Sequence, residues 1–179
     1  MERRSRLHLL ALALLVAFAA QGRVFLTQPQ ALAGAFPAGT KVTRQSVFLT
    51  AEQLAAARKT SGVDFSDQLI VRYVATSAAG AVVGYAYFDA HRVRTLPETV
   101  MVVLTADGKV AKIEILNFDE PPDYFPKPRW LEQFRGRKLD DELSLKRAVR
   151  PISGASLTGR AILNASRKVL ALHQVIGAK

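Results

Sequence analysis

The stretch TVMVVLTADGKVAKIEIL, residues 99–116, decides the fold of this chain. Asp107-Gly108 stands between two apolar runs, a pattern typical of a tight turn that joins two antiparallel strands. In the second run the apolar residues alternate with Lys112 and Glu114, so one face of that strand is expected to meet water. The sequence therefore predicts a β-hairpin over 99–116.

Strand-forming sequence continues upstream of this hairpin. The segments LIVRYVA (69–75) and AVVGYAYF (81–88) are rich in β-branched and aromatic residues, which favour strands. Farther upstream, Thr50 and Gln53 form the capping box of a helix that ends at Gly62, and a shorter helix is predicted within 27–39. We expect a small antiparallel sheet over 68–117, flanked by helices, in a single domain of the α+β class.

The segment that follows the hairpin is rich in proline. FDEPPDYFPKPRW (118–130) holds four of the eight prolines of the chain, together with several aromatic residues. The aromatic residues favour an ordered loop that packs on the domain, and RWLEQFRG (129–136) predicts a short helix. A final amphipathic helix is predicted over 158–175.

Composition narrows the function classes. The chain of 179 residues has no cysteine, which excludes disulfides, iron–sulfur clusters, covalent c-type haem and an acylated cysteine anchor. Its three histidines, His8, His91 and His173, are far apart in the sequence, which argues against a zinc site. The net charge of +10 favours an anionic partner, but no nucleic-acid-binding pattern accompanies it, so we expect no nucleic-acid partner.

The N-terminus has the pattern of a targeting segment. Three arginines, at positions 3, 4 and 6, precede the apolar run LHLLALALLVAFAA (7–20), and Ala17-Phe18-Ala19 supplies a small-x-small cleavage site. The run is short for a bilayer span, which needs about 20 residues, so a signal peptide is favoured over a membrane anchor. In either case we expect the rest of the protein outside the cytoplasm, in the periplasm, secreted or membrane-anchored.

These observations divide the chain into three parts. We predict a signal peptide or membrane anchor over 1–20, a connecting segment with a short helix over 21–44, and one domain over 45–179.

The stretch AVRPISGASLTGRAI (148–162) carries the strongest indication of function. Ser153-Gly154-Ala155-Ser156 is a run of small residues just before the final helix, where the backbone can approach a ligand closely. Unpaired N–H groups at a helix start favour anions, and the hydroxyls of Ser156 and Thr158 stand at the same end. Residues 127–150 hold eight Lys or Arg and four acidic residues, which also suits a phosphate. A plain helix N-cap is the alternative for this pattern.

The segment PISGASLTGRAI (151–162) resembles the flavinylation motif of the FMN-binding domain family, and the strand-rich body resembles a stand-alone branch of that family. The family includes the flavin-carrying subunits of sodium-pumping NADH:quinone reductase. The resemblance covers about residues 45–175 and implies an FMN-binding domain over 45–179, with FMN as its cofactor. In the family, a hydroxyl residue of this motif carries FMN through a phosphoester, which a flavin transferase installs from FAD outside the cytoplasm.

Mapped residue by residue, the resemblance makes Ser156 the acceptor and places Thr158 at the following hydroxyl position. Ser153, Gly154 and Ala155 complete the phosphate turn. Two positions depart from the family pattern, because the usual acceptor is threonine and because Arg150 stands where the family usually has aspartate. The arginine favours an alternative to the phosphoester, a non-covalent complex in which its guanidinium pairs with the flavin phosphate.

A second region offers residues for the flavin ring. GYAYFDAHRVRTLPE (84–98) holds Tyr85, Tyr87, His91, Arg94 and Glu98, and an isoalloxazine ring needs an apolar or aromatic wall with a few hydrogen-bond donors. We therefore include His91 among the candidate FMN-binding residues. The alternative is that these residues belong to core strands and that the histidine is merely exposed.

The resemblance implies an extracytoplasmic electron-transfer protein that holds FMN at the turn 153–158, with membrane redox proteins or cytochromes and a flavin transferase as partners. Two alternatives stay open: a flavin-dependent reductase with a small substrate, and a flavin-free basic binding module at the membrane surface. The sequence shows no nucleophile–base pair and no carboxylate pair with an obvious catalytic role. The absence of other redox ligands fits a carrier with one flavin, so an electron carrier is favoured over a stand-alone enzyme.

Overall fold

The computed structural model describes residues 23–177. The predicted signal peptide or membrane anchor, residues 1–20, lies outside this range. Within residues 23–177, no helix is both long and apolar enough to cross a membrane.

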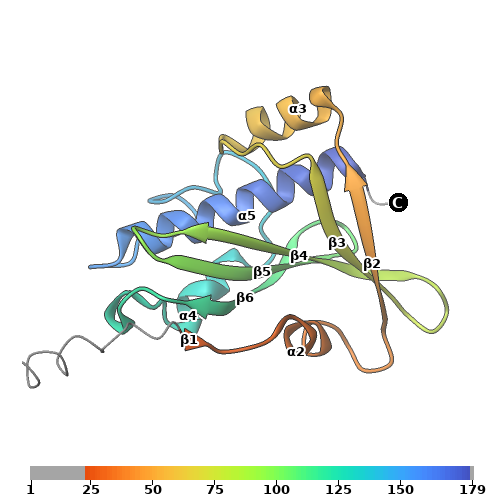
Figure 1. Ribbon diagram of the computed structural model, residues 1–179, viewed down its shortest axis with the longest axis horizontal. Coiled ribbons are helices and arrows are strands. Elements are labelled where there is room, and N and C mark those ends of the chain that lie inside the picture. The colour runs from red at the N-terminus through yellow and green to blue at the C-terminus, as the bar shows by residue number, and fades with distance from the viewer. Residues whose placement is uncertain (1–22, 178–179) are drawn as a thin grey trace, which may run out of the picture.

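The centre of the molecule is an antiparallel sheet with the strand order β1-β6-β5-β4-β3-β2 (Figure 1). Strands from β2 to β6 lie in chain order, so each pairs with the next strand along the sequence, and β1 pairs with β6. The strands are β1 (Arg23–Val24), β2 (Lys41–Phe48), β3 (Leu69–Thr76), β4 (Val82–Arg92), β5 (Pro97–Thr105) and β6 (Val110–Phe118).

Helices cover both faces of this sheet. Helices α3 (Ala51–Ser61) and α5 (Ser156–Ile176) lie on one face, and α2 (Gln28–Ala33) lies on the other (Figure 1). The proline-rich segment forms three short turns, which are η1 (Pro122–Tyr124), α4 (Pro128–Leu131) and η2 (Glu132–Phe134). The predicted α+β class, a small antiparallel sheet flanked by helices, is confirmed.

The stretch that decides the fold forms β5, β6 and the turn between them. Gly108 has a φ of +76°, a left-handed conformation that residues with a side chain rarely adopt. The N–H of Thr105 donates to the carbonyl of Lys109 at 2.8 Å and closes the turn. The turn also reaches the end of α5, since a Cβ on Gly108 would come within 3.1 Å of the His173 ring. The predicted hairpin is confirmed.

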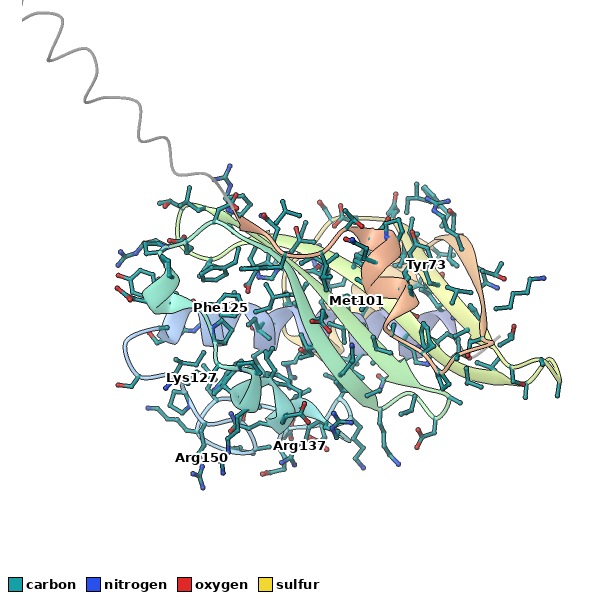
Figure 2. All side chains as sticks on the ribbon, turned by 90° about the horizontal axis from the view of Figure 1, so that it is seen from below. Tyr73, Met101, Phe125, Lys127, Arg137 and Arg150 are labelled. Atoms are coloured by element: carbon teal, nitrogen blue, oxygen red, sulfur yellow. The ribbon has the colours of Figure 1, made fainter. Side chains whose placement is uncertain are left out.

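Two apolar layers hold the helices to the sheet. The larger lies beneath α3 and α5 and includes Tyr85, Val102 and Ile162, each no more than 1% exposed. The smaller lies on the α2 face, where Met101 of β5 packs with Ala31 (Figure 2). Full burial of one large apolar side chain contributes about 1.5–3 kcal/mol, so these layers supply the main driving force for folding.

One long strand was not predicted. β2 forms the sheet edge and pairs with β3 from Lys41↔Thr76 to Phe48↔Leu69, so the sheet begins well before residue 68. Its residues are exposed or half-buried, and none is fully buried. Its sequence KVTRQSVF contains only three apolar residues, so the pattern of a buried strand is absent.

The sheet opens at one end between β3 and β4. Their pairing runs from Thr76↔Val82 to Arg72↔Tyr87 and stops there. β4 stays paired with β5 as far as Arg92↔Pro97. Among the described residues, positions 88–92 of β4 therefore have a neighbouring strand on one side only.

Candidate functional site

Helix α5 begins at Ser156, two residues before the predicted start, so the small-residue turn lies directly in front of it. Gly154 has a φ of +78°, and a Cβ on it would meet no atom within 4 Å, so the backbone is open there. The N-cap residue Ala155 makes no side-chain hydrogen bond to the helix. Among residues 23–177, no acceptor meets the N–H groups of Ser156, Leu157 or Thr158. These donors are available to an anion outside the helix.

A cavity of about 120 Å³, which we call the first cavity, opens at this helix start. The turn and the first residues of α5 form one wall. The loop between β4 and β5 and the segment after β6 form the other wall. The lining residues are Val93, Arg94, Glu120, Tyr124 and residues 154–158.

Glu120 holds the β4–β5 loop at the first cavity. Its Oε1 accepts hydrogen bonds from the backbone N–H groups of Arg94, Thr95 and Leu96 at 3.0, 3.0 and 3.1 Å. Burial of the carboxyl opposes ionisation, but the three N–H donors outweigh it and lower the pKa of Glu120 below its ordinary value. The ionised carboxylate therefore fixes the loop that carries Arg94.

Trp130 supports the turn from the proline-rich segment. Its indole Nε1–H donates to the carbonyl of Arg150 at 2.7 Å, and the N–H of Arg150 donates to Gln133 Oε1 at 2.9 Å. The indole also lies against α5, since a Cβ on Gly159 would be 3.4 Å from its Cζ2 atom. The short turns after β6 therefore brace the chain just before the first cavity.

The two predicted hydroxyl residues differ in exposure although both line the first cavity. Ser156 is exposed, whereas Thr158 is only 1% exposed. Gly154 and Ala155 line the cavity with them, so four of the predicted residues meet at one place.

Two of the predicted phosphate-binding residues lie outside this lining. Ser153 is exposed in the same turn but is not among the residues that line the first cavity. The Arg150 side chain is exposed and points away from the domain (Figure 2), and its backbone alone bonds to Trp130 and Gln133.

His91 lies in a different depression of about 190 Å³, which we call the second cavity. Residues 89–92 of β4 form one wall, and α5 contributes positions from Ala161 to Lys168. Phe65, in the segment that follows α3, also lines this cavity. Tyr85 and Tyr87 belong to the core instead, in line with the alternative interpretation of their sequence pattern.

His91 bridges two buried carboxylates in the second cavity. Its Nδ1 lies 2.9 Å from Asp89 Oδ2, and its Nε2 lies 2.8 Å from Glu98 Oε2. Burial opposes protonation, but the two carboxylates outweigh it and raise the pKa of His91 to about 9. Lys168 Nζ lies 2.8 Å from the other Asp89 oxygen and 3.5 Å from Asp67 Oδ2, so the cluster holds two cations and three carboxylates. The histidine is half-buried rather than exposed.

Sequence reasoning missed Glu120 and Tyr124 as lining residues of the first cavity. A local signal for Glu120 exists, because it lies two residues after the end of β6 and directly before Pro121-Pro122. Its partners, however, are backbone groups 24 to 26 residues away. Only the tertiary structure brings this carboxylate to the β4–β5 loop.

Free donors at a helix start, an arginine that lines the same cavity and small residues in front make this end of the α+β domain the candidate site for an anionic group such as a phosphate. The model of the FMN-binding domain family matches residues 96–171, which span β5, the small-residue turn and most of α5. This match supports the assignment of residues 96–171 to the FMN-binding domain family and FMN as the cofactor, and it confirms the resemblance. Comparison with curated proteins gives no match, and comparison with solved structures gives none either.

Proposed function

We propose that this protein is an extracytoplasmic electron-transfer protein that holds the phosphate of its FMN at the start of α5. The observation that carries the proposal is the uncapped helix start within the segment that the family model matches. The bound flavin supplies one- and two-electron chemistry, and the chain's own residues bind and orient it.

The start of α5 provides the electrostatic basis for phosphate binding. The helix has 21 residues, and its N-terminal end bears a partial positive charge of roughly +0.5 from the aligned peptide dipoles. The N–H groups of Ser156, Leu157 and Thr158 can donate to phosphate oxygens. Arg94 lines the same cavity and adds a full positive charge.

We propose further that Ser156 carries the flavin covalently. Its exposed side chain is within reach of a transferase, whereas Thr158 is buried. In the transfer, Ser156 Oγ bonds to the phosphorus of the FMN half of FAD while the pyrophosphate bond breaks. AMP leaves, and the hydroxyl proton passes to a base of the transferase or to water. No oxidant or reductant is consumed.

Arg150 offers the non-covalent alternative to this attachment. The described residues provide no ion-pair partner for its guanidinium, and its backbone is fixed by Trp130 and Gln133. Its side chain is therefore able to turn toward a phosphate at the adjacent turn. In that case Arg150→Ala is expected to weaken FMN binding, and Arg150→Asp is expected to raise flavinylation by a transferase.

The position of the site supports electron transfer to a partner. Gly154 and Ser156 are exposed, and Leu157 is 41% exposed, so the FMN-binding end of α5 lies at the protein surface. A cofactor held there is within reach of a second redox protein. By family analogy we propose membrane redox proteins or cytochromes as partners.

Coexpression with a flavin transferase, followed by intact-mass measurement of the denatured protein, tests the attachment. We expect a mass increase of one FMN less one water in the wild type and in Thr158→Ala, and no increase in Ser156→Ala. An adduct that persists in Ser156→Ala would contradict this acceptor. Absence of any adduct in the wild type, together with reversible FMN binding, would establish the non-covalent alternative.

Cell fractionation tests the proposed location. We expect the domain in the periplasmic or membrane fraction, and removal of residues 1–20 should retain it in the cytoplasm. Full-length protein found free in the cytoplasm would contradict the proposal.

A further inference from the structure

The first and second cavities open onto the same face of α5. Leu157 lines the first cavity, and Ala161, Asn164 and Lys168 line the second. These residues are spaced by four, three and four positions, which places them along one face of the helix. The two cavities therefore follow one another along α5.

β4 and the loop after it form the facing wall of both cavities. Residues 89–92 line the second cavity, and the next two residues, Val93 and Arg94, line the first. From Ser156 to Asn164 the helix rises by about 12 Å. The space between the two walls thus suits a long ligand that is anionic at the end near Ser156.

The volumes of the two cavities also indicate a shared ligand. Sites for ligands of cofactor size usually occupy about 300–1,000 Å³. Neither the first cavity, of about 120 Å³, nor the second, of about 190 Å³, reaches this range alone. A ligand of that size would therefore have to extend from one cavity into the next along α5.

Residues 89–92, which line the second cavity, lie beyond the point where β3 and β4 separate. Positions 88–92 of β4 pair with β5 alone, so one edge of this strand has no strand partner among the described residues. An open strand edge can bond a planar group that has both donors and acceptors, as the pyrimidine part of an isoalloxazine ring does. Val63 and Phe65 supply apolar surface, and the exposed Asn164 makes no side-chain hydrogen bond within residues 23–177.

Two cations of this cluster, Lys168 and His91, can face a ring that becomes more negative on reduction, and the carboxylates of Asp89, Glu98 and Asp67 hold them in place. Lys168 Nζ lies 5.2 Å from the centre of the Phe65 ring, and the side chains of Lys168 and His91 are 17% and 18% exposed. Beneath them Glu98 is fully buried, and its Oε1 has no hydrogen-bond partner among the described residues. A buried polar cluster with an unpaired oxygen requires an explanation, and a functional role supplies one.

We propose that the second cavity holds the isoalloxazine ring of the FMN whose phosphate lies at Ser156, and that Lys168 and His91 stabilise the reduced ring. The proposal rests on FMN binding at the start of α5. It keeps His91 beside the flavin ring, as expected from the sequence, and it adds Lys168 and Asn164 to the flavin site.

Two substitutions in the wild-type holoprotein test this assignment. Ala161→Leu fills the second cavity and should displace the flavin ring, while the phosphate keeps the flavin bound. We then expect the visible absorption bands of the flavin to lose the fine structure that a ring shielded from water shows. Ala55→Leu, on the exposed side of α3, is the matched control and should leave the spectrum unchanged. An unchanged spectrum in a folded Ala161→Leu protein would overturn the proposal.

The midpoint potential gives a second, independent readout. Lys168→Met removes a cation from the second cavity and should make the midpoint potential of the flavin more negative. Lys168→Arg keeps the cation and should leave the potential near the wild-type value. The control Lys59→Met removes an exposed lysine of α3 and should have no effect. Equal potentials in Lys168→Met and wild type would overturn the proposal even if Ala161→Leu does not fold.

A wild-type protein that binds no FMN would overturn both this inference and the proposed function. A wild-type protein that binds FMN, with an unchanged spectrum in Ala161→Leu and an unchanged potential in Lys168→Met, would overturn only this inference.

Discussion

The two longest helices of this domain begin in opposite ways. At the start of α3, the N–H of Gln53 donates to Thr50 Oγ1 at 3.2 Å, and the N–H of Thr50 donates to Gln53 Oε1 at 3.0 Å. At the start of α5, Ala155 has no side chain that could do the same. Side chains satisfy two backbone donors at the start of the first helix and none at the start of the second.

This difference shows how a helix start can be built for stability or for a ligand. A missing cap costs a helix about 1 kcal/mol. The long apolar face of α5, with Ile162, Val169 and Leu170 at most 2% exposed, makes this helix stable without a cap. The donors that a cap would have used are then free to bind the FMN phosphate.

Turning α5 into a capped helix should have the largest effect. In Ala155→Asp the new carboxylate accepts from the free N–H groups and repels a phosphate, so FMN affinity should fall at least about tenfold, or about 1.4 kcal/mol. Flavin fluorescence titration measures the affinity. Ala55→Asp on the surface of α3 is the control, and equal affinity in a folded Ala155→Asp protein would refute the role of the helix start.

Removing the cap of α3 should affect stability alone. Thr50→Ala deletes the oxygen that accepts the Gln53 N–H, and we expect the free energy of unfolding to fall by about 1 kcal/mol. FMN affinity should stay at the wild-type value, because this helix start lies outside the first cavity. Urea unfolding measures the stability, and fluorescence titration measures the FMN affinity. A loss of FMN affinity in Thr50→Ala would contradict the proposed difference between the starts of α3 and α5.

Acidification should weaken reversible FMN binding at α5. A phosphate monoester has its second pKa near 6, so the dianion that the helix favours is lost as the pH falls through about 6. Because one charge at a helix end contributes about 0.3–1 kcal/mol, affinity should fall about two- to fivefold between pH 8 and pH 5.

The described histidines should not obscure that titration. The two carboxylates beside His91 raise its pKa to about 9 against the effect of burial, and burial with the nearby Arg72 lowers the pKa of His173 to about 4. Neither titrates strongly between pH 5 and 8. An affinity that is constant over this range would indicate that the phosphate charge does not contribute.

The smallest effect is expected for the stability of Ser156→Ala. Ser156 is exposed and makes no side-chain hydrogen bond with the described residues, so the apoprotein should lose less than about 0.5 kcal/mol. Urea unfolding of Ser156→Ala and of Thr50→Ala compares the losses of unfolding free energy in the two variants. A loss as large as that of Thr50→Ala would show that Ser156 acts as a cap and not as a ligand residue.

Local signals made much of the fold predictable. The Asp107-Gly108 turn and the capping box of Thr50 and Gln53 are each determined by residues close in sequence, and both were predicted. β2 was missed because an edge strand needs no continuous apolar pattern, and the opening between β3 and β4 has no local signature at all.

The part of the candidate site that depends on neighbouring residues in the sequence was also predictable. The small-residue turn is contiguous in sequence, so its place before α5 followed directly from the pattern. The contact of Glu120 with the β4–β5 loop and the bridge of His91 between Asp89 and Glu98 depend on strand register, which the sequence does not specify. The pairing His91↔Glu98 across β4 and β5 therefore appears only in the structure.

Titration of the ¹⁵N-labelled protein with FMN, followed by amide chemical shifts, tests the central claim most directly. The free N–H groups at the start of α5 should bind the phosphate, so the largest shift changes should fall on residues 154–158. The capped start of α3, residues 50–53, should stay unchanged. The largest changes at any other segment, with residues 154–158 unaffected, would contradict the assignment of the FMN phosphate to the start of α5.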